Sequence, residues 1–331
     1  MTTPFSSLPI VDLDALQDDS PLSSSEQQRL SKQLYDVFAT TGFAYLINAP
    51  LSFTHEEVFR LAKQFFGLPR EEKMTLAKKT FESRNKNTYR GYFPAQPLAA
   101  SDNLKEGFEI GQTGVSPVVF QSSRFYLSEP NVWPHGSEVT SFRPRMERLY
   151  GELQSLASKL LGLLAISLGK EADFFAPYLE DSLSTLRLLY YPPATKVSNG
   201  SMTALDSDIL TSPEEITVKL SCTPHTDSGI LTLLHQDSTG GLEVLNASKQ
   251  WVPAPYLSGS IVVNIGDLMA QVSGGVFCAT MHRVRAPPEG RTKDGEISDT
   301  EDAKGIVYGE HVRSKMATWV EFQDLGDEEG D

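Results

Sequence analysis

Cysteine is scarce in this chain, and so are net positive charge and long hydrophobic runs. Only Cys222 and Cys278 occur among 331 residues, too few for a disulfide framework, so a cytoplasmic location is expected. The formal net charge of −14 disfavours nucleic acid or an anionic membrane as a partner, because phosphate binding needs clustered Lys and Arg. We also find no apolar run of about 18 residues and no basic-plus-apolar N-terminal signal, so neither a membrane span nor secretion is expected.

Two histidines and one carboxylate stand out among the residues that are present. His225 and Asp227 occur in Cys-Thr-Pro-His-Thr-Asp-Ser-Gly, and His282 occurs in Ala-Thr-Met-His-Arg-Val. This ligand set is that of a mononuclear non-haem iron(II) site with open coordination positions, although catalytic zinc uses it too. The flanking runs are β-prone, and residues two apart on a strand share a face, so His225 and Asp227 should point into one cavity. Cys222, three residues earlier, is expected to be a small buried hydrophobe and not a soft ligand.

His-x-acid pairs are weak evidence by themselves. With 6 His and 43 acidic residues, about 0.8 matches are expected by chance, and the chain has three. Thr54 and Glu57 form a capping-box pattern, so His55 is expected to begin an amphipathic helix. His235 and Asp237 would lie about 30 Å from the first pair along an extended chain, so His235 is expected to be a strand-end residue.

Hydrophobic periodicity predicts helices in the first half of the chain and strands in the second. The expected helices are 23–41, 55–66, 69–79, 145–168 and, near the C-terminus, 307–323. The expected strands are 43–47, 186–191, 218–221, 230–234, 242–245, 261–265 and 277–281. This order predicts an α+β, mainly β fold, a double-stranded β-helix (jelly-roll) barrel buttressed by N-terminal helices. Residues 1–184 would form the helical and strand region, 185–288 the barrel, and 289–331 an acidic, partly disordered tail.

Further signatures extend along the chain in a definite order. Gly240-Gly-Leu-Glu-Val, Trp251-Val-Pro, Val262-Val-Asn-Ile-Gly-Asp-Leu and His282-Arg-Val-Arg-Ala-Pro-Pro follow His225. Phe65-Phe-Gly-Leu-Pro-Arg-Glu-Glu-Lys-Met, Tyr89-Arg-Gly-Tyr and Lys105-Glu-Gly-Phe-Glu-Ile-Gly precede it. Over residues 8–288 the chain resembles the 2-oxoglutarate and iron(II)-dependent dioxygenases, in the isopenicillin N synthase-like branch.

The resemblance implies a cofactor set and a reaction. Iron(II) would be bound by His225, Asp227 and His282, with 2-oxoglutarate and O2 as co-substrates and ascorbate as a possible reductant. A small organic molecule would be hydroxylated, desaturated or cyclised while succinate and carbon dioxide are released. Tyr191, in Leu189-Tyr-Tyr-Pro, matches the family tyrosine that hydrogen-bonds 2-oxoglutarate, although Leu189 replaces the usual asparagine. A purely structural aromatic is the alternative for Tyr191.

The sequence departs from the family after the distal histidine. Family members continue into a strand with Arg-x-Ser, where the arginine pairs with the far carboxylate of 2-oxoglutarate. Arg291-Thr-Lys is near the right distance but lacks the serine and the apolar strand, and an exposed loop arginine is its alternative. Arg313 falls in the expected C-terminal helix and is a poorer replacement. An active oxygenase is therefore the leading hypothesis, and an inactive relative with a binding or regulatory role is the alternative.

The expected partner is a small natural product or catabolic intermediate, because no long basic or groove-like peptide surface is evident. Matching regions of the family line the mouth of the barrel, which makes six positions candidates for the substrate pocket. They are Tyr89, Arg90, Phe108, Glu109, Leu242 and Phe277.

Overall fold

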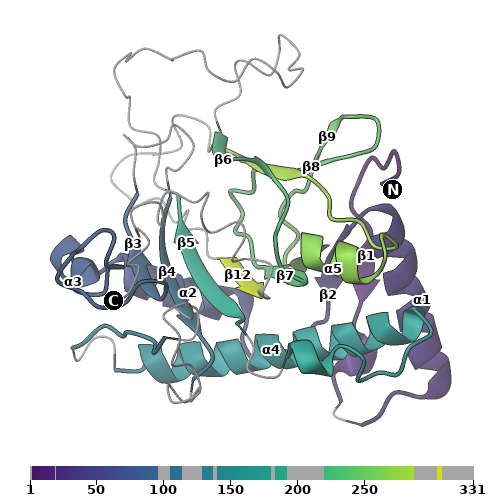
Figure 1. The fold of residues 1–331 in the computed structure, drawn as a ribbon, viewed down its shortest axis with the longest axis horizontal. Coiled ribbons are helices and arrows are strands. Elements are labelled where there is room, and N and C mark those ends of the chain that lie inside the picture. Colours follow the sequence, from purple (N-terminus) through teal and green to yellow (C-terminus); the bar gives the residue numbers. More distant parts are fainter. Residues whose placement is uncertain are drawn as a thin grey trace, which may run out of the picture.

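Two β-sheets and the helices packed against them make up the part of the chain that the structure describes. The structure, a computed structural model, describes residues 2–18, 20–95, 105–113, 129–136, 140–179, 183–191 and 220–286, and the backbone of 304–307. One sheet has eight strands and the other four. In Figure 1 the smaller sheet lies above the larger one, and the longest helix runs beneath it. Each helix in these described ranges is too short or too polar to traverse a bilayer.

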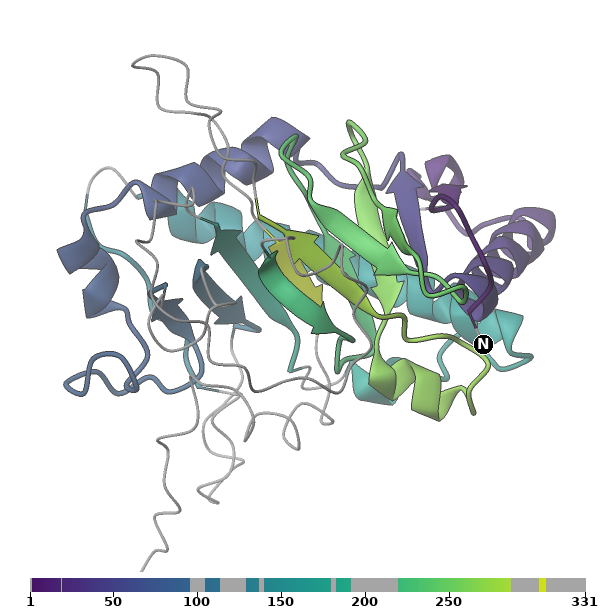
Figure 2. The ribbon, with the colours of Figure 1, turned by 90° about the horizontal axis from the view of Figure 1, so that it is seen from above.

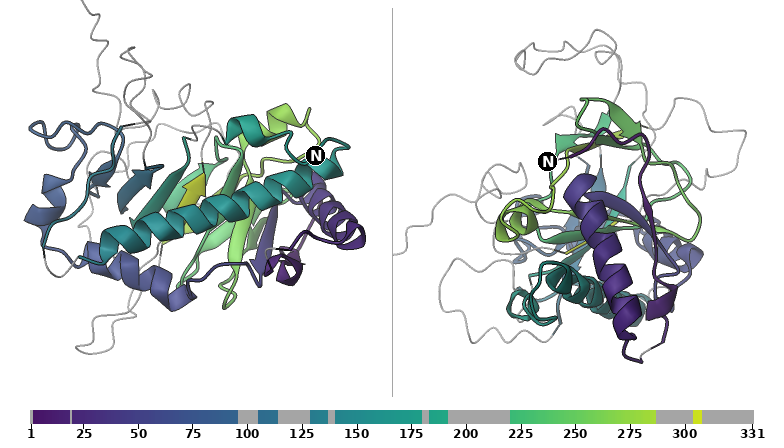
Figure 3. Two further views of the ribbon diagram at one scale, coloured as in Figure 1. Left: turned by 90° about the horizontal axis from the view of Figure 1, so that it is seen from below. Right: turned by 90° about the vertical axis from the view of Figure 1, so that its right-hand side faces the viewer.

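The predicted helices of the N-terminal half are confirmed. They are α1 (Ser24–Thr40), α2 (His55–Phe66), α3 (Arg70–Thr75) and α4 (Phe142–Ser167), and α5 (Asp267–Val272) is added later in the chain. Ser23 and Thr54 each begin their helix with a capping box, in which the N-cap side chain and a glutamate three residues on satisfy each other's backbone amides. The apolar side chains of α4 are buried in the core cluster that includes residues of the large sheet, and Figure 3 shows from below that the helix lies across this sheet. The helices α2 and α4 therefore cover one face of that sheet.

The large sheet combines strands from distant parts of the chain. Its order is β1 (Ile10–Asp12), β2 (Phe43–Ile47), β10 (Ile261–Ile265), β7 (Leu231–Leu234), β12 (Lys304–Val307), β5 (Thr185–Tyr190), β4 (Glu106–Gly111) and β3 (Gly91–Phe93). All neighbours pair antiparallel except β1 with β2. Along β7 the side chains of Leu231 and Leu233 join the helical core, whereas Leu234 joins the cluster between the sheets. This period of two separates a helix-facing side from a side that faces the smaller sheet.

The smaller sheet runs in the order β6 (Leu220–His225), β11 (His282–Arg285), β8 (Leu242–Leu245) and β9 (Trp251–Pro253). Its residues Val244 and Val284 pack with Phe43, Val262 and Leu234 of the large sheet in one buried cluster, so the two sheets face each other. The mixed α+β class that the sequence predicted is confirmed.

One predicted strand, 277–281, is wrong, because β11 begins only at His282. The first two residues of that segment, Phe277 and Cys278, are buried against α1 instead of pairing in a sheet. Phe277 packs edge-to-face on Phe38, and the Cys278 amide donates to the Phe38 carbonyl. A short apolar run does not distinguish a strand from a loop buried against a helix.

The sequence analysis also missed six strands, β1, β3, β4, β9, β11 and β12. The last of them, residues 304–307, lies in the tail that was expected to be partly disordered and helical, and it forms β12 between β5 and β7. The yellow β12 lies in this position in both Figure 1 and Figure 2. The rest of the predicted helix 307–323 lies outside the described residues.

Candidate metal site

Three of the predicted site residues converge at the edge of the smaller sheet. His225 ends β6, Asp227 follows two residues later, and His282 begins β11 directly opposite His225 in the antiparallel register. Asp227 Oδ1 lies 3.7 Å from His225 Nε2 and 3.6 Å from His282 Nε2, and the two imidazole centroids are 4.2 Å apart. Among the described residues this is the one group of three His, Cys, Asp or Glu whose ligand atoms lie within 4.8 Å of one another. The predicted ligand set therefore has the geometry of a metal site.

Backbone carbonyls fix the orientation of both imidazole rings. His225 Nδ1 lies 2.8 Å from the Thr223 carbonyl oxygen, and His282 Nδ1 lies 3.1 Å from that of Thr280. Thr280 is held in turn, because its hydroxyl donates to the Thr41 carbonyl at 2.8 Å. When Nδ1 carries the proton for these bonds, Nε2 is the ligand atom, and in both rings Nε2 points toward Asp227.

Asp227 is oriented by the large sheet, across from the histidines. Its Oδ2 accepts hydrogen bonds from Thr232 Oγ1 at 2.6 Å and from Asn264 Nδ2 at 2.8 Å, which leaves Oδ1 facing the imidazoles. Burial acts to raise the pKa of Asp227, but the charges of His282 and His225 and these two hydrogen bonds outweigh it and lower the pKa to about 2. The carboxylate is therefore ionised at neutral pH, as a metal ligand must be.

The His225 ring differs from the other ligands in its surroundings. Its side chain is 39% exposed, against 9% for His282 and 11% for Asp227. Burial alone would lower the pKa of His225, but the neighbouring Cys222 sulfur, with Asp227 and the Thr223 carbonyl, outweighs it and raises the pKa to about 9. A metal that binds Nε2 of His225 must therefore displace a proton from the imidazolium.

Backbone hydrogen bonds hold the chain segment of Asp227 against the start of α5. The Asp267 amide donates to the Asp227 carbonyl at 2.7 Å, and Thr226 Oγ1 donates to the Asp267 carboxylate at 3.2 Å, so Thr226 points away from the site as predicted. A Cβ at Gly266 would overlap the Gly229 carbonyl and lie 3.0 Å from the Asp227 carbonyl oxygen. The Asn-Ile-Gly-Asp motif thus has two roles at this site. Its asparagine, Asn264, donates a hydrogen bond to the Asp227 carboxylate. Its glycine, Gly266, is the N-cap of α5 and has no room for a side chain.

The other His-x-acid pairs lie away from this site, as the sequence predicted. His55 begins α2, and His235 follows the last residue of β7, with its ring centroid 6.2 Å from that of His55. Burial, followed by the nearby charge of His55, lowers the pKa of His235 to about 4, so this imidazole is neutral in the fold.

The remaining predicted positions have mixed outcomes. Cys222 packs against the cluster between the sheets but is only partly buried, not the buried hydrophobe that was expected, and its sulfur lies 3.7 Å from His225 Nδ1. Tyr191 is buried and packs with Phe93 and Leu189 at the end of β5. Arg291 lies outside the described residues.

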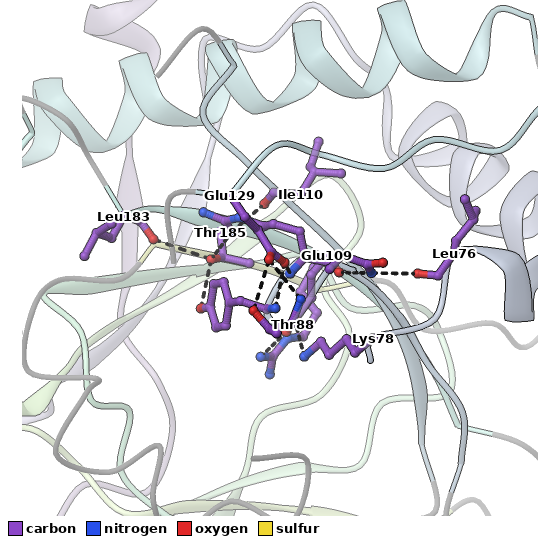
Figure 4. A network of polar contacts seen from close by, with 12 residues as sticks. Leu76, Lys78, Thr88, Glu109, Ile110, Glu129, Leu183 and Thr185 are labelled. Atoms are coloured by element: carbon purple, nitrogen blue, oxygen red, sulfur yellow. Dashed lines mark hydrogen bonds and ion pairs between the residues drawn. The ribbon is translucent and has the colours of Figure 1, made fainter. Parts of the chain in front are cut away.

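Three of the candidate pocket residues, Tyr89, Arg90 and Glu109, belong to a buried ionic cluster on and beside β3, β4 and β5. Figure 4 shows this cluster, with Lys78, Glu109 and Thr185 labelled. Glu109 is fully buried and pairs with Lys78 at 2.7 Å and with Arg187. Arg90 donates to Thr185 Oγ1 at 2.7 Å, and the Tyr89 hydroxyl lies 3.2 Å from the same oxygen. Phe108 and Phe277 lie in the helical core, and Leu242 lies between the sheets.

Sequence reasoning missed several residues that support the metal site and this ionic cluster. Thr232, Asn264, Lys78 and Arg187 are polar residues that lie buried in or beside strands. The available signal was a polar residue inside an apolar run, such as the asparagine in Val-Val-Asn-Ile, because buried polar groups require partners.

Comparison with known proteins agrees with this geometry. Residues 182–298 match the model of the 2OG-Fe(II) oxygenase superfamily, and residues 8–136 match that of the N-terminal region of non-haem dioxygenases in morphine synthesis. A 2-oxoglutarate-dependent dioxygenase of Didymella fabae is 33% identical over 301 residues, covering 88% of this chain and 81% of the relative. An iron/ascorbate oxidoreductase of Dictyostelium discoideum is 29% identical over 300 residues, covering 86% and 78%.

A solved structure is similar over most of the chain. A full-length Neurospora crassa protein in complex with alpha-KG and 5-formyluracil superposes with a TM-score of 0.69 at 26% identity, covering 93% of this chain and 86% of that one. With the His-Asp-His triad intact, the chain belongs to the 2OG-Fe(II) oxygenase superfamily, as a 2-oxoglutarate-dependent dioxygenase that uses iron(II).

Proposed function

We propose that His225, Asp227 and His282 hold the iron(II), and that the enzyme hydroxylates, desaturates or cyclises a small organic molecule with release of succinate and carbon dioxide. The observation that carries this proposal is the convergence of two Nε2 atoms and one Oδ1 atom, each with its other polar atom already engaged by the protein. Two imidazoles and one carboxylate on one face suit iron(II), and they leave positions for a bidentate co-substrate and oxygen.

Iron(II) with 2-oxoglutarate and oxygen supplies the oxidising power needed to remove hydrogen from a C–H bond. The contribution of the protein is to orient the ligands and to restrict water. Phe43 packs edge-on against the His282 ring at 5.2 Å, which closes that side of the site. Since His225 is the most exposed ligand, we propose that the substrate approaches from its side.

The fold proposed for the site is the double-stranded β-helix barrel. Its support is the pair of facing sheets, the antiparallel register between β6 and β11, and the structural similarity to solved 2OG-Fe(II) oxygenases. We propose that residues 185–288 form most of this barrel and that β1 to β4 of the N-terminal region extend its larger sheet. The fungal relatives favour a substrate from secondary metabolism.

One observation favours a second candidate function. A strand does follow the distal histidine, at β12, but its sequence Lys-Gly-Ile-Val contains neither the arginine nor the serine of the family's Arg-x-Ser. A dicarboxylate whose distal charge lacks a partner is costly to bury, so 2-oxoglutarate would bind weakly unless another residue replaces that arginine. In that case the protein would serve a binding or regulatory role without turnover.

The deciding experiment is anaerobic addition of iron(II) and 2-oxoglutarate to the purified protein. We expect the weak visible charge-transfer band of the chelate in the wild type, and its loss in His225→Ala and Asp227→Ala. His235→Ala is the matched control, since it removes a buried imidazole outside the site and should keep the band. Retention of stoichiometric iron by Asp227→Ala would overturn the ligand assignment.

Two further measurements complete this test. Succinate formation in air separates the active oxygenase from a binding protein. Titration of Tyr191→Phe and Arg291→Ala with 2-oxoglutarate tests the two residues proposed to contact the co-substrate. A large loss of affinity in Arg291→Ala would identify it as the anchor of the distal carboxylate.

A further inference from the structure

Lys105 extends from the large sheet toward the metal site. It precedes β4, just beyond the last register pair of β4 and β5, Glu106 with Tyr190. By the strand period, Lys105 shares a face with Gly107. That face is turned inward, because Phe93 and Leu189, the cross-strand neighbours that a Cβ at Gly107 would meet, are buried with Tyr191 in one apolar cluster. The Lys105 ammonium accordingly lies 3.9 Å from Cys222 Sγ, on a strand of the other sheet.

The contact with Cys222 places a positive charge beside an expected iron ligand. Cys222 Sγ is itself 3.7 Å from Nδ1 of His225, the most exposed of the three ligand residues. With a metal–nitrogen bond near 2 Å, the ammonium lies within about 12 Å of a metal bound at His225 Nε2. It therefore lies on the side from which we propose that the substrate approaches.

The partner of Lys105 is chemically unusual for a half-buried cation. Within the described part of the chain, its polar contact is the Cys222 sulfur, a weak acceptor, and no carboxylate lies within ion-pair distance. The neighbouring inward or buried lysines are different. Lys73 pairs with Glu106 at 3.0 Å, and Lys78 pairs with Glu109 at 2.7 Å. Buried cations are normally paired with a carboxylate in this way. Because the Lys105 ammonium contacts only a weak acceptor among the described residues, it is suited to bind an anionic group of a ligand.

We propose that Lys105 binds a carboxylate at the metal site. The inference rests on the proposed function, and it adds a residue from β4 to a site otherwise built from β6, β7, β10 and β11. The carboxylate comes either from the distal end of 2-oxoglutarate or from the substrate, which would then be an organic acid. Both sources present the same chemistry to the ammonium, a charge-assisted hydrogen bond. Lys105 thereby provides a positive charge at the metal site in a chain whose β12 lacks the arginine of the family's Arg-x-Ser.

Three variants test this role. Lys105→Met removes the charge and keeps much of the side-chain volume, whereas Lys105→Arg keeps the charge. Lys32→Met is the control, because Lys32 is 75% exposed on α1 and pairs with Asp36. The first assay is anaerobic titration of each iron(II) protein with 2-oxoglutarate, in which the charge-transfer band reports binding. The second measures substrate-dependent 2-oxoglutarate consumption with a panel of small carboxylic acids and their primary amides.

The two assays distinguish the sources of the carboxylate. If 2-oxoglutarate supplies it, Lys105→Met should bind 2-oxoglutarate about ten- to a hundredfold more weakly, the range for a lost hydrogen bond to a charged group, and Lys105→Arg should recover part of the loss. If the substrate supplies it, 2-oxoglutarate binding should be unchanged. The wild type should then prefer acids over amides, and Lys105→Met should raise KM for the acid much more than it lowers kcat.

The proposal is overturned if Lys105→Met matches Lys32→Met in 2-oxoglutarate affinity and shows no change in acid preference, or if the wild type responds to no acid and binds 2-oxoglutarate independently of residue 105. Either result would leave iron and 2-oxoglutarate binding by the wild type intact. It would therefore reject the role of Lys105 without rejecting the proposed function.

Discussion

Replacing Asn264 with leucine should weaken iron binding without unfolding the protein. Asn264 is 2% exposed on β10, and its amide donates one of the two hydrogen bonds that hold Asp227 Oδ2. Leucine has a similar shape, so the main loss is that bond, worth about 1.5–3 kcal/mol when the acceptor is charged. Thr232 keeps the second bond at 2.6 Å, so Asp227 stays ionised but less firmly oriented. Iron(II) affinity should fall about ten- to a hundredfold, the usual effect of losing a partner of a metal ligand.

The measurement is anaerobic iron(II) titration of the wild type and of Asn264→Leu, with urea unfolding of both metal-free proteins. Asn246→Leu is the matched control, because Asn246 is also buried and hydrogen-bonded, to Phe5 and Gln250, on the loop after β8. The control should lose stability and keep its iron affinity. If Asn264→Leu binds iron within twofold of the wild type, or if Asn246→Leu loses as much affinity, the orientation argument is wrong.

Three further predictions concern packing and charge. Gly266→Ala should lower both iron affinity and stability, because its Cβ would overlap the Gly229 carbonyl, whereas Gly151→Ala, with nothing nearby, should raise stability by about 0.5–1 kcal/mol in the same urea assay. Glu109→Gln should reduce the free energy of unfolding by about 3–5 kcal/mol, since it leaves buried cations without their carboxylate; unchanged stability would contradict this account. The pKa of His235 is lower in the folded than in the unfolded protein, so the contribution of its neutral imidazole to stability is fully present above pH 6.5 and is lost as the pH falls toward 4. Over that window the free energy of unfolding of the wild type should fall by up to about 3 kcal/mol more than that of His235→Gln. Parallel pH profiles of stability for the two proteins would contradict this prediction.

The sequence predicted the elements that depend on local chemistry. The capping-box pattern at Thr54 and the hydrophobic periodicity of residues 23–41 and 145–168 identified the helices, because these signals arise within a few turns of one chain segment. The strands β2, β8 and β10 matched their predicted ranges. Their runs are short and mostly apolar, interrupted only by Glu243 in β8 and Asn264 in β10, as expected for largely buried strands.

The errors arose where distant segments decide the outcome. Residues 277–281 have a strand-like composition but are buried against α1, a contact between parts of the chain more than 200 residues apart. The strand β12 forms because it lies between β5 and β7 and pairs with both, which local composition does not reveal. Tertiary context overrides local propensity in both cases.

The metal site combines both kinds of information. Residue types and the spacing of His225 and Asp227 were readable locally, but the approach of His282 depends on the pairing of β11 with β6. A shift of that register by one residue would turn the side chain at position 282 to the opposite face and separate the imidazoles. The carbonyls of Thr223 and Thr280 orient the rings through backbone geometry, and Thr280 is also held by its own hydroxyl, so Thr223→Val should leave the contact with His225 in place, whereas Thr280→Ser keeps the hydroxyl that Thr280→Val would lose. Iron binding should therefore be more sensitive to changes that alter strand register or the contact at Gly266 than to Thr223→Val or Thr280→Ser.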